Sequence, residues 1–331
     1  MRAGGQVQRE IEWTFVYDFP HYQPALTRPP DFEEFWKKTL AELETVPPDV
    51  QMTLNKEKST AQADVYEVSL ASLDSRRVWG WYACPTKPGK YPVTYFCPPT
   101  GVYALPMWVG DGGGEYCTFA LAIHGFDLHL SNMRAGDPWM GYHTLGLISP
   151  QTAAWRWIYA SMVRCMDFLV SRPEVDATRI NVSGSSQGGG LAMILASLDP
   201  RVALCTPMWS GLPRLDWTVK YKTGYWPFGM AAKPAEATEA EFLNTLSYFD
   251  AANFTPDMRC PLVAYIGMMD WVTASGNQVC ACAHLPAGRV ELLCDTWGGH
   301  GSSLAPALVA RRNEVLDAFL HGRSVELQPS K

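Results

Sequence analysis

One stretch near the middle of the chain, residues 179–191, limits what the sequence can fold into more than any other. A short β-branched run ends there at Gly184-Ser185-Ser186-Gln187-Gly188, a Gly-x-Ser-x-Gly pattern, and gives way to leucine, alanine and methionine. This order predicts a strand, a sharp turn and a helix, with Ser186 lifted out of the sheet at the turn. Glycine on either side removes the Cβ atoms that would collide with strand and helix. We therefore predict that Ser186 is a nucleophile.

Two other interpretations of this stretch are weaker. Gly188-Gly189-Gly190 has the composition of a phosphate-binding loop, but neither Lys-Ser nor Lys-Thr follows it, so a nucleotide site is not expected. A glycine- and serine-rich loop also fits a loose five-residue pattern by chance. The surroundings oppose chance, because a strand precedes the pattern, a helix follows it, and an aspartate and a histidine come later in the chain.

The length and composition of the chain predict one large α/β domain, residues 1–331. Its 331 residues are 47% hydrophobic and 18% charged, enough for one sizeable core with decorations. Residues 1–60 are expected to form an N-terminal extension, and the aromatic-rich residues 209–250 an insertion near the site. A formal net charge of -6 without basic runs predicts that neither nucleic acid nor an anionic membrane is a partner.

The apolar runs, the cysteines and the spacing of possible metal ligands predict the compartment and the cofactors. No run approaches the roughly 18 apolar residues of a membrane-spanning helix, and residues 1–8 lack the apolar core of a secretory signal. We expect a cytoplasmic protein or, alternatively, a secreted or periplasmic one with its leader removed. Nine scattered cysteines, an odd number, favour a reducing compartment. Cys280, Cys282 and His284 match no usual zinc spacing, so neither a metal nor another cofactor is expected.

Alternating strand and helix patterns predict a mostly parallel sheet flanked by helices, with ligand chemistry at the carboxyl ends of its strands. The first two strands are expected to form an antiparallel pair at a sheet edge. Asp31 is expected to cap the first helix. The expected strands are 65–70, 78–83, 92–97, 118–123, 180–182, 202–205, 261–266 and 290–294, and the main expected helices are 31–43, 152–170 and 303–320.

Three residues with complementary chemistry each follow a different expected strand. A serine hydroxyl is a weak nucleophile, so it needs an imidazole to take its proton and a carboxylate to orient that imidazole. Ser186, Asp270 and His300 follow the expected strands 180–182, 261–266 and 290–294, in the order Ser, Asp, His that α/β-hydrolases use. We predict that these three residues form a catalytic triad.

Each partner of Ser186 has a rival. His124 and His129 follow an earlier strand, whereas His300 lies in a glycine-rich loop directly after a late strand. Asp295 also lies at a strand end, but it shares a loop with His300. A carboxylate on the preceding strand reaches the far nitrogen of the imidazole more readily, which favours Asp270.

The oxyanion of such a reaction needs two donors. The backbone N–H of Gln187, which follows the nucleophile, is expected to supply the first. The second is expected from Thr100 or Gly101 after an early strand, because the two prolines before them have no N–H. Trp209, at the start of the aromatic-rich insertion, and His129 are predicted to contact the substrate.

With the triad placed, the chain resembles the acetyl xylan esterase and cephalosporin-C deacetylase group, carbohydrate esterase family seven, from about residue 31 to residue 320. The resemblance implies an α/β-hydrolase fold, catalytic roles for Ser186, Asp270 and His300, and hydrolysis of short acyl esters, chiefly acetyl groups on sugars. It also implies a homo-oligomer, often a ring-like hexamer whose active sites face an inner cavity. The matching stretches are 31–36, 172–176, 184–191, 246–250 and 267–270.

Three motifs differ from those of that family. Cys97-Pro98-Pro99 stands where the family has His-Gly-Tyr, His129-Leu130-Ser131 where it has Arg-Gly-Gln, and His300-Gly301 where it has His-Glu. We predict a serine esterase that removes short acyl groups, acetyl foremost, from carbohydrate esters through an acyl-enzyme. The alternatives are an esterase for a different sugar or small-molecule ester, and a non-catalytic homologue that binds a glycan through its aromatic insertion.

Overall fold

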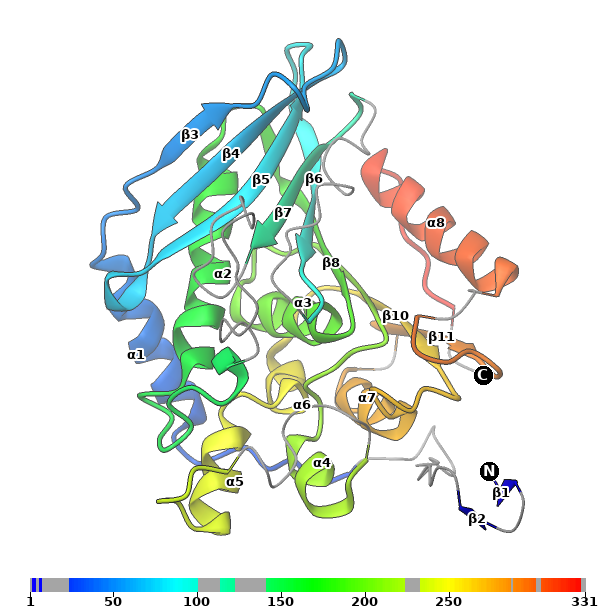
Figure 1. Cartoon of the computed structure of the whole chain (residues 1–331). Coiled ribbons are helices and arrows are strands. Elements are labelled where there is room, and N and C mark those ends of the chain that lie inside the picture. The colour runs from blue at the N-terminus through cyan, green and yellow to red at the C-terminus, as the bar shows by residue number, and fades with distance from the viewer. Residues whose placement is uncertain are drawn as a thin grey trace.

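The computed structural model describes residues 2–3, 6–7, 24–100, 114–122, 141–223, 233–286, 288–301 and 305–328. Nine strands form one sheet in the order β11-β10-β9-β8-β6-β7-β5-β4-β3 (Figure 1). Strands β11, β10, β9, β8, β6 and β7 run parallel to one another, and β5, β4 and β3 extend the sheet beyond β7, each antiparallel to the strand before it. The strands are β3 (Gln51–Leu54), β4 (Ala63–Ala71), β5 (Arg77–Pro85), β6 (Tyr91–Cys97), β7 (Cys117–Ala122), β8 (Val175–Ser185), β9 (Leu204–Met208), β10 (Leu262–Gly267) and β11 (Val290–Asp295).

Helices cover both faces of this sheet, which confirms the predicted mostly parallel α/β architecture (Figure 1). A separate antiparallel pair, β1 (Arg2–Ala3) and β2 (Gln6–Val7), lies near the start of the chain. Within the described residues, no helix is both long enough and apolar enough to cross a membrane. The helices are α1 (Phe32–Glu44), α2 (Ala154–Ser171), α3 (Gln187–Leu198), α4 (Leu215–Tyr221), α5 (Glu239–Ser247), α6 (Ala251–Phe254), α7 (Ser275–Cys282) and α8 (Pro306–Leu320).

The core is divided by the sheet because successive strand residues point to opposite faces. On β10, Leu262 and Ala264 belong to the large cluster that α1, α2, α3 and α6 complete. Val263 and Tyr265, which alternate with them, belong to the smaller cluster under α8, together with Phe319 of that helix. Both faces of the parallel strands are therefore dry, as their near-continuous apolar sequences predict.

Two local predictions were wrong. The β4–β5 pair is antiparallel as expected, but β3 lies outside it at the edge of the sheet. The sequence does not indicate β3, because a strand of four mostly exposed residues is too short to show an alternating apolar pattern. Asp31 makes no side-chain cap on α1. Its Oδ1 accepts a hydrogen bond from the Tyr248 hydroxyl instead, because α1 packs on the region of α5 and α6 through buried Phe32 and Trp36.

Candidate active site

Ser186 occupies the sharp turn between β8 and α3, as the sequence predicts. Its φ of 58° and ψ of −126° are strained for a residue with a Cβ. The neighbouring glycines are required by close packing: a Cβ on Gly184 would lie 2.4 Å from the carbonyl oxygen of Gly188, and a Cβ on Gly188 would lie 2.3 Å from that of Cys97. The backbone therefore holds the serine hydroxyl at the carboxyl edge of the sheet.

Three loops bring Ser186, His300 and Asp270 together. His300 Nε2 is 3.0 Å from Ser186 Oγ, and His300 Nδ1 is 2.9 Å from Asp270 Oδ2. The Asp270 carboxyl group is fully buried, whereas the His300 side chain is 20% exposed. A buried carboxylate on Nδ1 favours the tautomer that leaves Nε2 free to accept the serine proton. The three residues chosen from sequence thus meet in the geometry of a catalytic triad.

Thr273 and Val272 hold the Asp270 carboxylate, a role that sequence reasoning missed. Their backbone N–H groups donate to Asp270 Oδ1 at 2.9 and 2.8 Å. The Thr273 hydroxyl lies 2.7 Å from Asp270 Oδ2, 3.3 Å from His300 Nδ1 and 3.0 Å from the carbonyl oxygen of Trp209. The only available signal was a threonine three residues after an aspartate, which is typical of local side-chain turns.

The rival carboxylate, Asp295, has a different function in the structure. Its Oδ2 accepts a 2.6 Å hydrogen bond from the Tyr265 hydroxyl, and its Oδ1 accepts the backbone N–H groups of Trp297 at 3.2 Å and Gly298 at 3.0 Å. The Tyr265 hydroxyl is the main reason that the pKa of Asp295 lies below its ordinary value. Asp295 therefore stabilises the loop that leads to His300.

Trp209 lies behind the histidine. Its ring is 8% exposed and packs at 5.5 Å on Tyr265 and at 6.1 Å on His300, measured between ring centroids. This position supports the imidazole ring, and the predicted contact of Trp209 with substrate stays a prediction. His129, the other predicted substrate contact, and His124 lie outside the described residues.

The predicted oxyanion donors lie at the start of α3 and after β6. As the first residue of α3, Gln187 has a backbone N–H without an intrahelical acceptor. Its side-chain Oε1 accepts from the Tyr142 hydroxyl at 2.7 Å and lies 3.2 Å from His143 Nε2, two contacts that the sequence did not indicate. The Thr100 hydroxyl is buried without a hydrogen-bond partner among the described residues. The use of the backbone N–H groups of Gln187 and Thr100 as oxyanion donors stays a prediction. Gly101, the alternative to Thr100, lies outside the described part of the chain.

Two of the three residues considered as metal ligands have other partners. His284 Nε2 lies 2.9 Å from the carbonyl oxygen of Pro24, and Cys280 Sγ accepts a 3.6 Å hydrogen bond from Arg214. Among the residues that the structure describes, no group of three or more histidine, cysteine, aspartate or glutamate side chains is placed to hold a metal ion.

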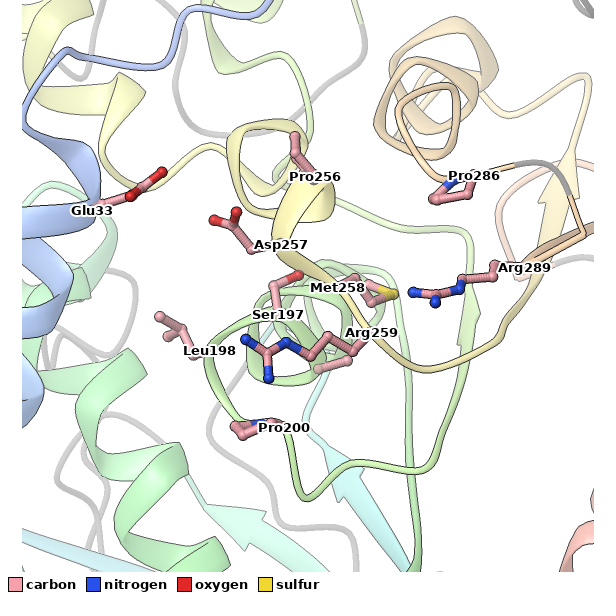
Figure 2. Close-up of a pocket in the computed structure, with 11 residues that line it drawn as sticks. Glu33, Ser197, Leu198, Pro200, Pro256, Asp257, Met258, Arg259, Pro286 and Arg289 are labelled. Carbon is pink, nitrogen blue, oxygen red and sulfur yellow. The ribbon is translucent and has the colours of Figure 1, made fainter.

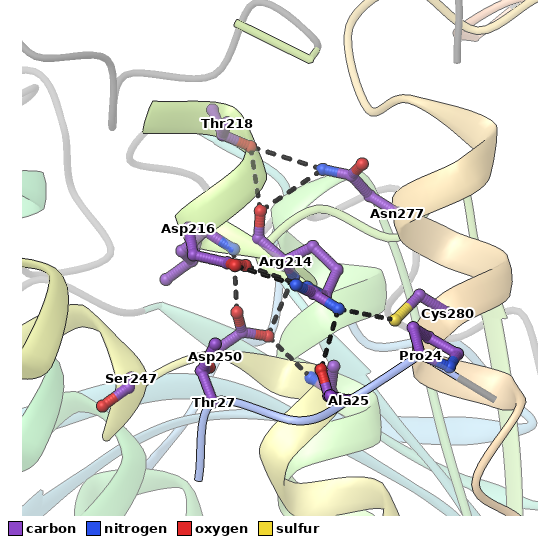
Figure 3. A network of polar contacts seen from close by, with 12 residues as sticks. Pro24, Ala25, Thr27, Arg214, Asp216, Thr218, Ser247, Asp250, Asn277 and Cys280 are labelled. Carbon is purple, nitrogen blue, oxygen red and sulfur yellow. Dashed lines mark hydrogen bonds and ion pairs between the residues drawn. The ribbon is translucent and has the colours of Figure 1, made fainter. Parts of the chain in front are cut away.

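A buried ionic network joins the segment after β9 to the N-terminal part of the chain (Figure 3). The Arg214 guanidinium pairs with Asp216 at 2.8 Å and donates to the carbonyl oxygen of Ala25 at 3.1 Å. Asp250 accepts the backbone N–H groups of Arg214 and Leu215 at 2.9 and 2.8 Å. Burial, with a smaller contribution from Asp216, raises the pKa of Asp250 to about 7. The network therefore holds the segment after β9, which begins at Trp209, the residue whose ring packs on His300.

A pocket of about 520 Å³ lies at the other end of the sheet (Figure 2). Arg259 and Arg289, which precede β10 and β11, line it, so it is at the amino edge and contains none of the triad. Two of its acidic groups, Asp257 and Glu33, are already paired with Arg28 at 2.7 and 3.1 Å.

Fold and site together define the class of protein. A mostly parallel sheet with a serine at a strand–helix turn, followed in the chain by an aspartate and a histidine at later strand ends, is the α/β-hydrolase arrangement. The chain belongs to the acetyl xylan esterase family: the sequence model of the acetyl xylan esterase (AXE1) family matches residues 16–291. This confirms the family that the sequence motifs predict.

Individual relatives agree with this membership. The chain is 29% identical to acetyl esterase Axe7A of Xylanibacter ruminicola over 282 residues, which are 82% of this chain and 63% of that protein. It therefore spans less than two thirds of the length of this curated relative. An acetyl xylan esterase structure from Paenibacillus sp. R4 superposes with a TM-score of 0.78 at 26% identity, covering 92% of this chain and 98% of that one. Acetyl xylan esterase 1 from Thermoanaerobacterium sp. shares the fold, with a TM-score of 0.79, 18% identity and coverage of 95% and 100%.

Proposed function

We propose that this chain is a serine esterase that removes short acyl groups, acetyl foremost, from carbohydrate esters. The observation that carries the proposal is the pair of contacts made by His300, 3.0 Å to Ser186 Oγ and 2.9 Å to Asp270 Oδ2. Membership of the acetyl xylan esterase family supports the ester substrate and its sugar. The similar protein named an acetyl esterase supports the acetyl group.

The reaction uses groups of this chain and water. Ser186 Oγ attacks the ester carbonyl carbon while His300 Nε2 takes the hydroxyl proton, and Asp270 stabilises the imidazolium. The negative charge on the former carbonyl oxygen is met by the backbone N–H of Gln187. Collapse of this intermediate breaks the bond to the sugar oxygen, which receives the proton from His300. Water, deprotonated by His300, then attacks the carbonyl carbon of the acyl-enzyme. The bond from that carbon to Ser186 Oγ breaks, the acid leaves, and His300 returns the proton to Ser186 Oγ.

Replacement of Ser186 by alanine tests the nucleophile. We expect the rate on 4-nitrophenyl acetate to fall to less than about a thousandth of that of the unchanged protein, because the other triad members do not compensate for a missing nucleophile. Ser185→Ala is the matched control, since Ser185 is the last residue of β8, next to the turn, whereas His300 Nε2 contacts the hydroxyl of Ser186. Greater residual activity in Ser186→Ala would contradict the assignment.

Two alternatives make different predictions. A non-catalytic glycan-binding homologue would not react with a fluorophosphonate, whereas an activated Ser186 is modified covalently and loses the label in Ser186→Ala. An esterase for another substrate would react, but would prefer a different acid or alcohol. Rates of release of acetate, propionate and bulkier acids from sugar and aryl esters distinguish this case from the acetyl-sugar proposal.

We also propose a homo-oligomer, such as a hexamer, and a reducing compartment such as the cytoplasm. The family resemblance supports the homo-oligomer. The nine cysteines, which are all free thiols, support the reducing compartment. Sedimentation velocity measures the oligomer, and a monomer at micromolar concentration would contradict it. Fractionation of the source cells tests the compartment.

A further inference from the structure

Two tryptophan side chains reach solvent from the loops that carry the triad aspartate and histidine. Trp271 directly follows Asp270 and is 36% exposed. Trp297 precedes His300 by three residues and is 83% exposed, although a tryptophan ring is among the most favourable side chains to bury. Three residues span at most about 11 Å of chain, so the backbone of both tryptophans lies close to the reacting groups.

Backbone hydrogen bonds join the two loops. Beyond the paired ends of β10 and β11, Met268 N–H donates to the carbonyl oxygen of Asp295 at 2.9 Å, and Met269 N–H donates to that of Gly298 at 2.9 Å. A Cβ on Gly267 would lie 2.7 Å from the same Gly298 oxygen, which shows how closely the loops approach. Trp271 and Trp297 therefore flank the same carboxyl edge from which Ser186 projects.

The loop that presents Trp297 is held by Asp295. Asp295 is 9% exposed and accepts the N–H groups of Trp297 and Gly298, and the hydrogen bond from the Tyr265 hydroxyl lowers its pKa. A Cβ on Gly298 would lie 2.6 Å from Asp295 Cγ, so this turn requires glycine. The backbone under the exposed ring is thus ordered before any ligand arrives, which lowers the entropy lost on binding.

We propose that Trp297 and Trp271 form a binding surface for the sugar rings that neighbour the esterified sugar. A pyranose ring offers a flat C–H face that packs on an aromatic ring while its hydroxyl groups stay hydrated at the rim. This inference rests on the proposed esterase function, and it concerns residues outside the triad.

A second copy of the chain is the competing occupant, and the size of the surface argues against it. A stable protein interface needs about 800 Å² on each partner around an apolar centre. The other large apolar side chains exposed among the described residues lie on other elements, such as Leu54 on β3 at the opposite edge of the sheet. Two aromatic rings beside a nucleophile match a sugar-binding surface better than the centre of a protein interface.

Binding is tested in the Ser186→Ala form, so that no turnover interferes. Xylohexaose is titrated by calorimetry into this form with and without Trp297→Ala. We expect Trp297→Ala to weaken binding about ten-fold and Trp297→Phe, which keeps an aromatic face, to weaken it about three-fold or less. Trp297→Leu, which keeps apolar bulk without an aromatic face, should resemble Trp297→Ala. Leu54→Ala is the matched control for an exposed apolar side chain and should bind unchanged.

Activity supplies the second measurement. In the active protein we expect Trp297→Ala to lower the ratio of kcat/KM for acetylated xylo-oligosaccharide to kcat/KM for 4-nitrophenyl acetate about ten-fold, since only the glycan reaches the ring. An unchanged ratio together with unchanged xylohexaose binding overturns the proposal. Absence of binding to the parent form at millimolar xylohexaose also overturns it, as does dissociation of an oligomer by Trp297→Ala in sedimentation velocity.

These outcomes are separable from failure of the proposed function. If Ser186 neither reacts with fluorophosphonate nor turns over aryl acetate, yet xylohexaose binding depends on Trp297, the esterase proposal fails and the sugar surface stands. If Ser186 is active and Trp297 has no effect in either assay, the esterase stands and the surface fails.

Discussion

Replacement of Asp270 by asparagine tests whether this carboxylate sets the tautomer of His300. Asp270 Oδ1 accepts two backbone N–H groups, from Val272 at 2.8 Å and Thr273 at 2.9 Å, whereas Oδ2 is 2.9 Å from His300 Nδ1. An asparagine keeps both backbone hydrogen bonds only if its oxygen takes the Oδ1 position. Its NH₂ group then takes the Oδ2 position and donates to Nδ1, which places the imidazole proton on Nε2.

A proton on Nε2 removes the acceptor that the Ser186 hydroxyl requires. We expect kcat on 4-nitrophenyl acetate to fall about ten-thousand-fold, the loss known when a triad aspartate of a serine protease becomes asparagine. This equals about 5 kcal/mol of transition-state stabilisation. The fold should persist, because the Thr273 hydroxyl can donate to the carbonyl oxygen of Trp209 at 3.0 Å instead. The free energy of unfolding should change by about 1 kcal/mol or less.

Steady-state kinetics measure kcat, and urea unfolding of the same preparations measures the free energy of unfolding. Asp257→Asn is the control, because Asp257 lies at the opposite edge of the sheet in an ion pair with Arg28 and should leave kcat unchanged. If Asp270→Asn keeps its stability and loses less than about ten-fold in kcat, the tautomer argument is refuted.

Two further predictions concern stability. Gly190→Ala places a Cβ 1.9 Å from the carbonyl oxygen of Gly211 and should lower the free energy of unfolding by about 3 kcal/mol in urea, whereas Gly299→Ala, whose nearest contact is 3.7 Å, should change it by less than about 1 kcal/mol. Equal losses would contradict the packing argument. The second prediction uses the buried Asp250, whose pKa in the folded chain is about 7 against about 3.9 unfolded. The folded chain holds a proton that the unfolded chain has released, so this contribution is complete below pH of about 4 and is lost as pH rises through 7. The difference in free energy of unfolding between the unchanged protein and Asp250→Asn should fall by about 2 kcal/mol from about pH 5.5 to 7.5, and a constant difference would exclude the titration.

Much of the fold follows from local patterns. Apolar runs bounded by turn residues indicate the parallel strands and the long helix α2, so the sequence predicts their positions within a few residues. The exposed edge strand β3 has no such pattern, and it forms because β4 offers unpaired backbone groups beside it. The contact of Asp31 with Tyr248 joins residues 217 positions apart, which no local rule anticipates.

For the candidate site, sequence by itself determined which three side chains meet. Ser186, Asp270 and His300 each follow a strand pattern, and the carboxyl ends of parallel strands share one edge of a sheet, so their order along the chain places them together. Only the tertiary structure decided what surrounds them. Thr273 joins the Asp270 loop to the carbonyl oxygen of Trp209, and Trp297 lies open to solvent, through the way separate loops pack and bond across that edge. The physical reason is range: strands and turns arise from neighbours in sequence, whereas exposure and hydrogen-bond partners arise from segments that meet only in the folded chain.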